Sequence, residues 1–234
     1  MNALRQPTVP PCLQVALDMV SLNVAVGVAE RIAGKVRRLE VGTPLLLASG
    51  LAAVRRMRAL APDAVIVADT KICDAGERIA LSAFEAGADV VTVVAAVADR
   101  ATWEGVGRAA RAEEDIAPWR RRLVMADLIG CSDEPEAARR AQELGAHEVC
   151  LHLPRWPQVG SRDVGTALAR IEAVRRAVAV PVYVAGGLGP EDLPKLAGSG
   201  VDGFIVGGAV TSASDPLGVL QALHAQLSGP GTRP

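Results

Sequence analysis

Apolar positions along the chain follow two alternating patterns. Short continuous apolar runs are typical of strands buried on both faces, and the longer amphipathic stretches between them are typical of helices. The strands are predicted at 13–18, 38–42, 64–68, 89–95, 122–128, 147–153, 181–187 and 203–208. The helices are predicted at 22–34, 50–60, a segment ending at 86, 99–114, 135–144, 165–178, 190–197 and 216–227.

This order, with one helix after each strand, predicts an α/β fold with a parallel sheet and right-handed crossovers. Repeated units of this kind, in a chain of 234 residues, predict a closed (β/α)8 TIM barrel. A doubly wound open sheet is the alternative, but the Gly-rich fingerprint after its first strand is missing here. We therefore expect a single-domain barrel over 1–234, with its core at 11–228 and short flexible termini.

Charge and composition favour a small ligand. The net charge is −1, and charges of both signs are spread along the chain, so nucleic acid and acidic membranes are not expected partners. The four cysteines are far apart, which argues against a zinc site or a disulfide framework. Neither a signal peptide nor an apolar segment of ~20 residues is evident, so we expect a cytoplasmic protein.

The stretch AVIVADTKICDAG at 64–76 combines a buried strand with charged residues. Its apolar half is expected to form a central strand. Asp69 and Lys71 follow, two residues apart, and point to the same face if the strand continues. Asp74 is expected on the loop after them. The position of these charges, between a buried strand and a helix, makes them candidate catalytic residues.

Polar residues also end other predicted strands. Asp18, Glu40, Asp127 and His152 stand at the carboxyl ends of the first, second, fifth and sixth strands, where TIM barrels assemble their active sites. Each acid taken alone is more often a helix cap or a solvated loop residue. Together they would form a charged cluster that is costly to bury unless its members pair or bind a metal.

Glu40 and Asp69 lie on neighbouring strands and offer the hard oxygen ligands that Mg²⁺ prefers. We interpret them as metal ligands; the alternative is an acid pair neutralised by Lys71. Lys71 could also donate a hydrogen bond to a substrate oxygen. His152 is the one histidine of three that is placed for acid–base catalysis.

Paired glycines follow the last two strands, where the phosphate site of this barrel type usually lies. They are Gly186, Gly187, Gly207 and Gly208. Glycines let backbone N–H groups approach an anion closely, which predicts a phosphorylated substrate. Tight turns between strand and helix are the alternative explanation.

Several segments together resemble the orotidine 5′-monophosphate decarboxylase superfamily, and more closely its branch of 3-hexulose-6-phosphate synthases and 3-keto-L-gulonate-6-phosphate decarboxylases. They are LQVALD at 13–18, EVGTPL at 40–45, ADTKICDAG at 68–76, GADVVTV at 87–93, DLIG at 127–130, VAGGL at 184–188 and VGGAV at 206–210. The resemblance covers nearly the whole chain in order.

The resemblance implies a homodimer in which Asp74 reaches into the partner's site. It also implies Mg²⁺ held by Glu40 and Asp69, and an enediolate formed from a sugar phosphate. Asp18 and Thr43 are expected to bind substrate. A metal-assisted enediolate agrees with the charges read from the residues, since a divalent cation and Lys71 would both stabilise negative oxygen.

The two activities of this branch are harder to separate. Asp127 and the Gly-Gly-Ala after the last strand resemble the synthase, whereas the spacing of His152 and Arg155 resembles the decarboxylase. Arg155 could orient a water for protonation, clamp a substrate, or lie on the rim of the pocket. We expect first a 3-hexulose-6-phosphate synthase acting on D-ribulose 5-phosphate and formaldehyde. The alternatives are a 3-keto-L-gulonate-6-phosphate decarboxylase, a related lyase with another phosphorylated substrate, or a non-catalytic barrel that binds a sugar phosphate.

Overall fold

The computed structural model describes residues 10–112, 122–153 and 164–228. Within these residues, eight parallel strands close into a barrel in chain order, with β8 paired to β1. The prediction of a (β/α)8 barrel is therefore confirmed, whereas the domain limits stay a prediction. The strands are β1 (Cys12–Leu17), β2 (Arg38–Val41), β3 (Val65–Ile72), β4 (Val90–Val94), β5 (Leu123–Asp127), β6 (Glu148–His152), β7 (Val182–Ala185) and β8 (Gly203–Val206).

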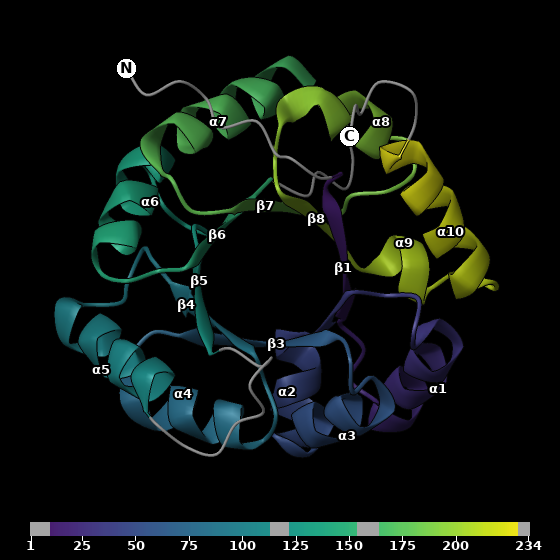
Figure 1. The fold of residues 1–234 in the computed structure, drawn as a ribbon, viewed down its shortest axis with the longest axis horizontal. Coiled ribbons are helices and arrows are strands. Elements are labelled where there is room, and N and C mark those ends of the chain that lie inside the picture. The colour runs from purple at the N-terminus through teal and green to yellow at the C-terminus, as the bar shows by residue number, and fades with distance from the viewer. Residues whose placement is uncertain (1–9, 113–121, 154–163, 229–234) are drawn as a thin grey trace.

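The helices form an outer ring around the strands, as the view down the barrel shows (Figure 1). They are α1 (Leu22–Ile32), α2 (Thr43–Ser49), α3 (Ala52–Leu60), α4 (Gly76–Glu85), α5 (Arg100–Arg111), α6 (Glu134–Glu143), α7 (Val164–Ala177), α8 (Leu193–Leu196), α9 (Gly208–Thr211) and α10 (Pro216–Leu227). None of the helices in the described ranges is both long enough and apolar enough to cross a membrane.

Three expected elements differ clearly from the sequence prediction, and the short helix α9 was not predicted. The helix expected at 50–60 starts earlier and is divided into α2 and α3, because Gly50 ends α2 with φ +58°. The helix expected at 190–197 is shorter, and a 3₁₀ turn at Ala197–Ser199 follows it. Strand β3 extends to Ile72 instead of ending at Ala68, so Asp69 and Lys71 belong to the strand itself.

Successive strand residues contribute to two separate hydrophobic cores, as the two-residue period of a strand requires. Ile66 packs in the larger core between the strands and the helices, whereas its neighbour Val67 packs in a smaller core inside the barrel. Met125 and Cys150 belong to the inner core as well. The inner core therefore lies beneath the side chains that stand two residues later on the same strands, such as Asp127 and His152.

Candidate active site

A cavity of about 1300 Å³ opens at the carboxyl ends of the strands. Most of the residues predicted from the sequence to form the site line it, and they come from strands far apart in the chain. These lining residues are Asp18, Glu40, Asp69, Lys71, Asp127, His152, Gly186, Gly187, Gly207 and Gly208. The barrel thus brings the predicted acids, the lysine, the histidine and the glycines to one place.

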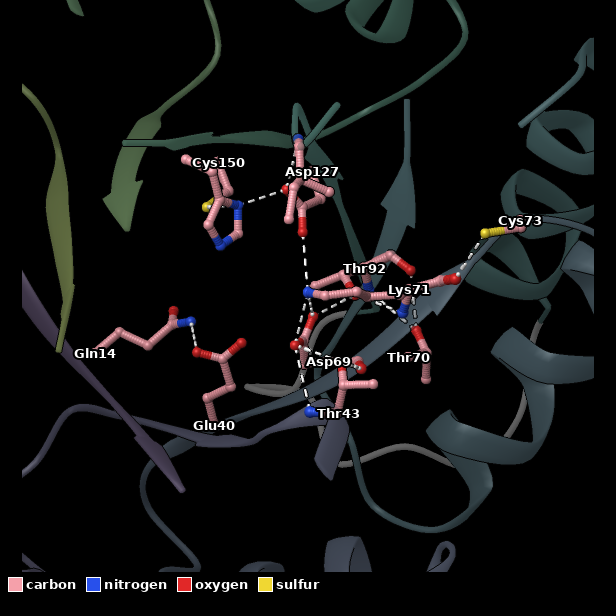
Figure 2. A network of polar contacts seen from close by, with 12 residues as sticks. Gln14, Glu40, Thr43, Asp69, Thr70, Lys71, Cys73, Thr92, Asp127 and Cys150 are labelled. Atoms are coloured by element: carbon pink, nitrogen blue, oxygen red, sulfur yellow. Dashed lines mark hydrogen bonds and ion pairs between the residues drawn. The ribbon is translucent and has the colours of Figure 1, made fainter. Parts of the chain in front are cut away.

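Lys71 is the centre of the charged cluster (Figure 2). Its Nζ lies 2.8 Å from each carboxylate oxygen of Asp69 and 3.0 Å from Oδ2 of Asp127. Burial would lower the pKa of Lys71, but the charges of Asp69 and Asp127 outweigh burial and raise it. Lys71 is therefore a permanent cation at neutral pH, held between two carboxylates.

A β-bulge in β3 places Asp69 and Lys71 in the cluster. The register of β3 against β4 shifts between Ala68 and Ile72, and Lys71 has a left-handed backbone with φ +43°. The Thr92 hydroxyl of β4 lies 2.9 Å from Oδ1 of Asp69 and also accepts the backbone N–H of Lys71 at 2.9 Å. The two side chains therefore meet through a bulge rather than through a regular strand.

Thr43, at the start of α2, contacts Asp69 from the other side. Its hydroxyl oxygen lies 2.7 Å from Oδ2 of Asp69 and 2.8 Å from the main-chain oxygen of the same residue. Its backbone N–H donates to Oδ2 at 3.3 Å. The geometry supports a role in orienting Asp69, and the predicted contact of Thr43 with substrate stays a prediction.

Asp127 and His152 form a hydrogen-bonded pair. Nδ1 of His152 lies 2.7 Å from Oδ1 of Asp127, which also accepts the backbone N–H of Ile129 at 3.0 Å. Burial alone would raise the pKa of Asp127, but the hydrogen bond and charge of His152, together with Lys71, lower it. Because Asp127 occupies Nδ1, Nε2 is the imidazole nitrogen available to the cavity.

Cys150 lies below this pair, and its Sγ is 3.9 Å from Nδ1 of His152. Asp127, Cys150 and His152 place three potential ligand atoms within 4.8 Å of one another. However, burial raises the pKa of the Cys150 thiol well above its usual value, and only the thiolate is a metal ligand. We therefore interpret these three residues as a hydrogen-bonded group.

Glu40 is buried at the end of β2 and accepts a hydrogen bond from Nε2 of Gln14 at 2.9 Å. Its burial, together with the negative charge of Asp69 nearby, raises its pKa to about 8. A carboxylate whose ionisation is disfavoured by a neighbouring carboxylate fits a divalent cation, which would neutralise the negative charge of the pair. Glu40 and Asp69 are thus the residues that could hold Mg²⁺.

Asp18 follows β1 and lies between two glycines. A Cβ at Gly42 would come within 2.1 Å of its Oδ1, and one at Gly207 within 3.0 Å of its Oδ2. Any larger residue at Gly42 would displace the Asp18 carboxylate from the cavity. Gly207, predicted from the sequence to face phosphate, therefore also makes room for this carboxylate.

The turn after β7 requires glycine. Gly186 and Gly187 have φ values of +120° and +61°, which other residues rarely adopt. A Cβ at Gly186 would come within 2.1 Å of the carbonyl oxygen of Leu153, just after β6. The last two strands thus end in exposed backbone beside the cavity, with Gly207 preceding α9 and Gly208 beginning it.

Asp74 lies away from the described cavity lining, and the position of Arg155 is not described. Asp74 is exposed on the loop between β3 and α4 and does not belong to the described lining of the cavity. Arg155 lies outside the described residues, as do the other residues at 154–163.

Residues 11–223 match the family model of the orotidine 5′-phosphate decarboxylase / HUMPS family. The chain belongs to this family. The family predicted from the sequence motifs is therefore confirmed.

Relatives within the family include enzymes of both predicted activities. The chain is 36% identical over 218 residues to a 3-hexulose-6-phosphate synthase of Mycobacterium gastri, covering 92% of this chain and 99% of that protein. It is 34% identical to the 3-keto-L-gulonate-6-phosphate decarboxylase SgbH of Escherichia coli K12, covering 93% and 94%. The crystal structure of KGPDC from Streptococcus mutans in complex with D-R5P has a TM-score of 0.82 and 30% identity, covering 93% and 97%.

These relatives also bear on the reaction class. A crystal structure of 3-hexulose-6-phosphate synthase has a TM-score of 0.80 and 35% identity, covering 92% of this chain and 99% of that one. Synthase and decarboxylase both make or break a carbon–carbon bond, so the prediction of a carbon–carbon lyase is confirmed.

Three residues that contact the site were not predicted from the sequence: Thr92, Gln14 and Gly42. Thr92 is the one polar residue in the apolar strand β4. Its side chain points into the barrel, as that of Asp69 does on β3. Gln14 could be found in the same way, since it precedes Ala16 by two residues in an otherwise apolar strand. The role of Gly42 has no local signal, because it depends on Asp18 from another strand.

Proposed function

We propose that this chain is a Mg²⁺-dependent 3-hexulose-6-phosphate synthase, which joins D-ribulose 5-phosphate to formaldehyde through an enediolate. The main supporting observation is the cluster in which Lys71 lies between Asp69 and Asp127, with the buried Glu40 beside it. A cation, a pair of oxygen ligands and a hydrogen-bonded imidazole are the groups that enediolate chemistry needs.

Glu40 and Asp69 would hold the metal, which would stabilise the negative charge on the enediolate oxygens when bound. Lys71 would donate hydrogen bonds to the same oxygens as they gain charge. Thr43 and Thr92 fix the Asp69 carboxylate from two sides, so this group needs little rearrangement when the substrate binds. The charged groups are thus preorganised around one region of the cavity.

His152 is proposed as the group that removes the proton from the carbon beside the substrate carbonyl. Its Nε2 faces the cavity side of the ring, while Nδ1 is held by Asp127 at 2.7 Å. An ionised Asp127 stabilises the imidazolium that forms when Nε2 takes the proton. The pair would return that proton in the reverse reaction.

The phosphate of the substrate would lie against the ends of β7 and β8. Gly186, Gly187, Gly207 and Gly208 present backbone there without side chains that would shield it. Lys71 and Arg170 are the only lysine and arginine among the described residues that line the cavity, and both are paired with carboxylates. Backbone N–H groups are therefore the donors proposed for the phosphate.

We also propose a homodimer whose interface lies at the carboxyl ends of the strands, with Asp74 of each chain acting in the partner's site. The large apolar residues that are exposed within the described ranges support this proposal, since they follow the carboxyl ends of β1, β2, β4 and β5. They are Val20, Val24, Leu47, Val97 and Ile129, with Leu47 84% exposed. Apolar side chains concentrated beside the active-site loops are typical of an interface.

The decarboxylase is the second candidate, supported by relatives of nearly equal identity. Substitution Arg155→Ala would distinguish the two. If Arg155 positions a proton donor, decarboxylation of 3-keto-L-gulonate 6-phosphate should be lost while hydrogen exchange into ribulose phosphate survives. Equal loss of both reactions would contradict that role of Arg155.

The deciding experiment is incorporation of solvent deuterium into D-ribulose 5-phosphate, followed by NMR with Mg²⁺ and with a chelator. We expect metal-dependent exchange at the carbon beside the carbonyl, followed by hexulose phosphate on addition of formaldehyde. Exchange without condensation would favour a different electrophile. Binding of the sugar phosphate with no exchange at all would favour a non-catalytic barrel.

A further inference from the structure

A chain of buried polar side chains crosses the inside of the barrel below Glu40. Its members are Gln14 of β1, Arg38 of β2 and Glu148 of β6. Their exposed fractions are 0%, 6% and 5%, so water does not replace the contacts among them. Because Arg38 and Glu40 are two residues apart on β2, both point into the barrel.

The hydrogen bonds of this chain fix which way the Gln14 amide points. Nε of Arg38 donates to Oε1 of Gln14 at 2.9 Å, and a guanidinium has no acceptor to offer in return. The amide oxygen of Gln14 must therefore face Arg38. The NH₂ group then faces Glu40, where it donates to Oε2 at 2.9 Å.

Arg38 is itself held in place. Its NH1 and NH2 donate to the two carboxylate oxygens of Glu148 at 2.9 and 2.7 Å, and its guanidinium lies 4.5 Å from the centre of the Tyr183 ring. A bidentate pair of this kind is geometrically specific. The orientation of Gln14 is thus set from the opposite side of the barrel, by residues 110 positions apart in the chain.

From this geometry we infer that Gln14 is a positioning residue for the metal site: its NH₂ group occupies one oxygen of Glu40 and turns the other toward the cavity. The inference rests on the proposed role of Glu40 as a metal ligand. Arg38 and Glu148 act indirectly, because they hold the Gln14 amide that in turn holds the Glu40 carboxylate. A hydrogen bond to a ligating carboxylate typically changes metal affinity 10- to 100-fold.

A purely structural role would have a different signature. Apolar residues such as Val65 and Leu123 fill neighbouring inward positions at the same end of the barrel. Because a buried ion pair is seldom more stabilising than apolar packing, stability alone gives little reason for a polar chain here. If Gln14 were only structural, its substitution would change the free energy of unfolding and leave the metal affinity unchanged.

The test is direct binding of Mn²⁺, measured from the EPR signal of the free ion without substrate, on wild type and the Gln14→Met variant. Methionine keeps the approximate length of glutamine and removes the donor. We expect the Mn²⁺ dissociation constant to rise about tenfold or more. Thermal unfolding in EDTA gives the stability of each variant without metal.

Leu123→Ala is the matched control, because it removes inward-facing volume at the same end of the barrel without touching Glu40. It should lower the unfolding temperature and leave Mn²⁺ affinity at the wild-type value. If Gln14→Met does not fold, Gln14→Leu replaces it, since leucine also fills the position and has no donor for Glu40. A Gln14 variant that binds Mn²⁺ as tightly as wild type overturns the inference.

Failure of the proposed function is a separate result. If wild type itself binds no Mn²⁺ and shows no metal-dependent exchange, Glu40 is not a metal ligand and the proposed function fails. If wild type binds and exchanges while the Gln14 variants bind equally well, only the positioning role is wrong.

Discussion

At the scale of single residues, Lys71 is the most constrained group in the site. A left-handed backbone at a residue other than glycine costs about 1–3 kcal/mol. Its backbone N–H is bonded to Thr92 and its ammonium to Asp69 and Asp127, so the surrounding contacts determine this conformation. Strain that persists at a charged cluster in a cavity supports a functional role for Lys71.

Substitution Lys71→Met should abolish exchange and also destabilise the fold. It leaves Asp69 and Asp127 without their cation, which for buried pairs costs roughly 3 kcal/mol. Arg139→Met is the control, because its ion pairs with Glu136 and Glu143 are exposed to water and should contribute little to stability. Urea unfolding measures both, and equal losses would contradict the assignment of Lys71 to a buried cluster.

Metal affinity should depend on pH through Glu40. Below its pKa of about 8, Glu40 is protonated, and a divalent cation can bind only after that proton leaves. The Mg²⁺ dissociation constant should therefore fall as pH rises, by about tenfold per unit, and become constant above the pKa. Calorimetry in two buffers of different ionisation enthalpy should show about one proton released.

The Glu40→Gln variant provides the control for this pH dependence. It should bind the metal more weakly and without that dependence on pH. A wild-type affinity that does not change across this range would show that Glu40 is already ionised without the metal.

At the scale of elements, the contact between α4 and α5 depends on glycines. A Cβ at Gly76 would come within 2.2 Å of the carbonyl oxygen of Thr102, and one at Gly105 within 2.9 Å of the backbone nitrogen of Glu77. The two helices thus approach at backbone distance. This close approach fixes the start of α4, which directly follows the loop containing Asp74.

Gly76→Ala should destabilise the protein by about 2 kcal/mol, because the helices must separate to admit the methyl group. Gly27→Ala in α1 is the matched substitution, since a Cβ there meets nothing within 4 Å. It should stabilise the protein by about 0.5–1 kcal/mol through helix propensity alone. Thermal unfolding of both variants checks the prediction, and shifts of the same sign would contradict it.

The element scale also shows how far sequence periodicity reaches. The alternation of apolar and polar positions predicted every strand and placed Glu40, Asp127 and His152 at strand ends, where they lie. It did not predict that β3 continues through Lys71 with a bulge, because the bulge depends on hydrogen bonds to Thr92 of the next strand. By contrast, the alternation of side chains along a strand is enough to indicate that Thr92 and Gln14 face the inside of the barrel.

At the scale of the whole molecule, the proposed dimer would complete each site with Asp74 of the other chain. Inactive Asp74→Ala and Lys71→Ala chains should then complement each other, because a mixed dimer contains one site in which both residues are intact. We expect up to about half of the wild-type exchange rate in verified mixed dimers, since the second site lacks both. No recovery would contradict a shared site.

The sequence by itself determined the order of strands and helices, the barrel, and the polar residues at its carboxyl end. These features follow from local periodicity and strand parity, which need no knowledge of distant contacts. Tertiary structure alone decided that Asp18 lies between Gly42 and Gly207, and that Glu148 orients Gln14 through Arg38. Barrel closure brings these residues together across the interior, and no pattern along the chain records distances of that kind.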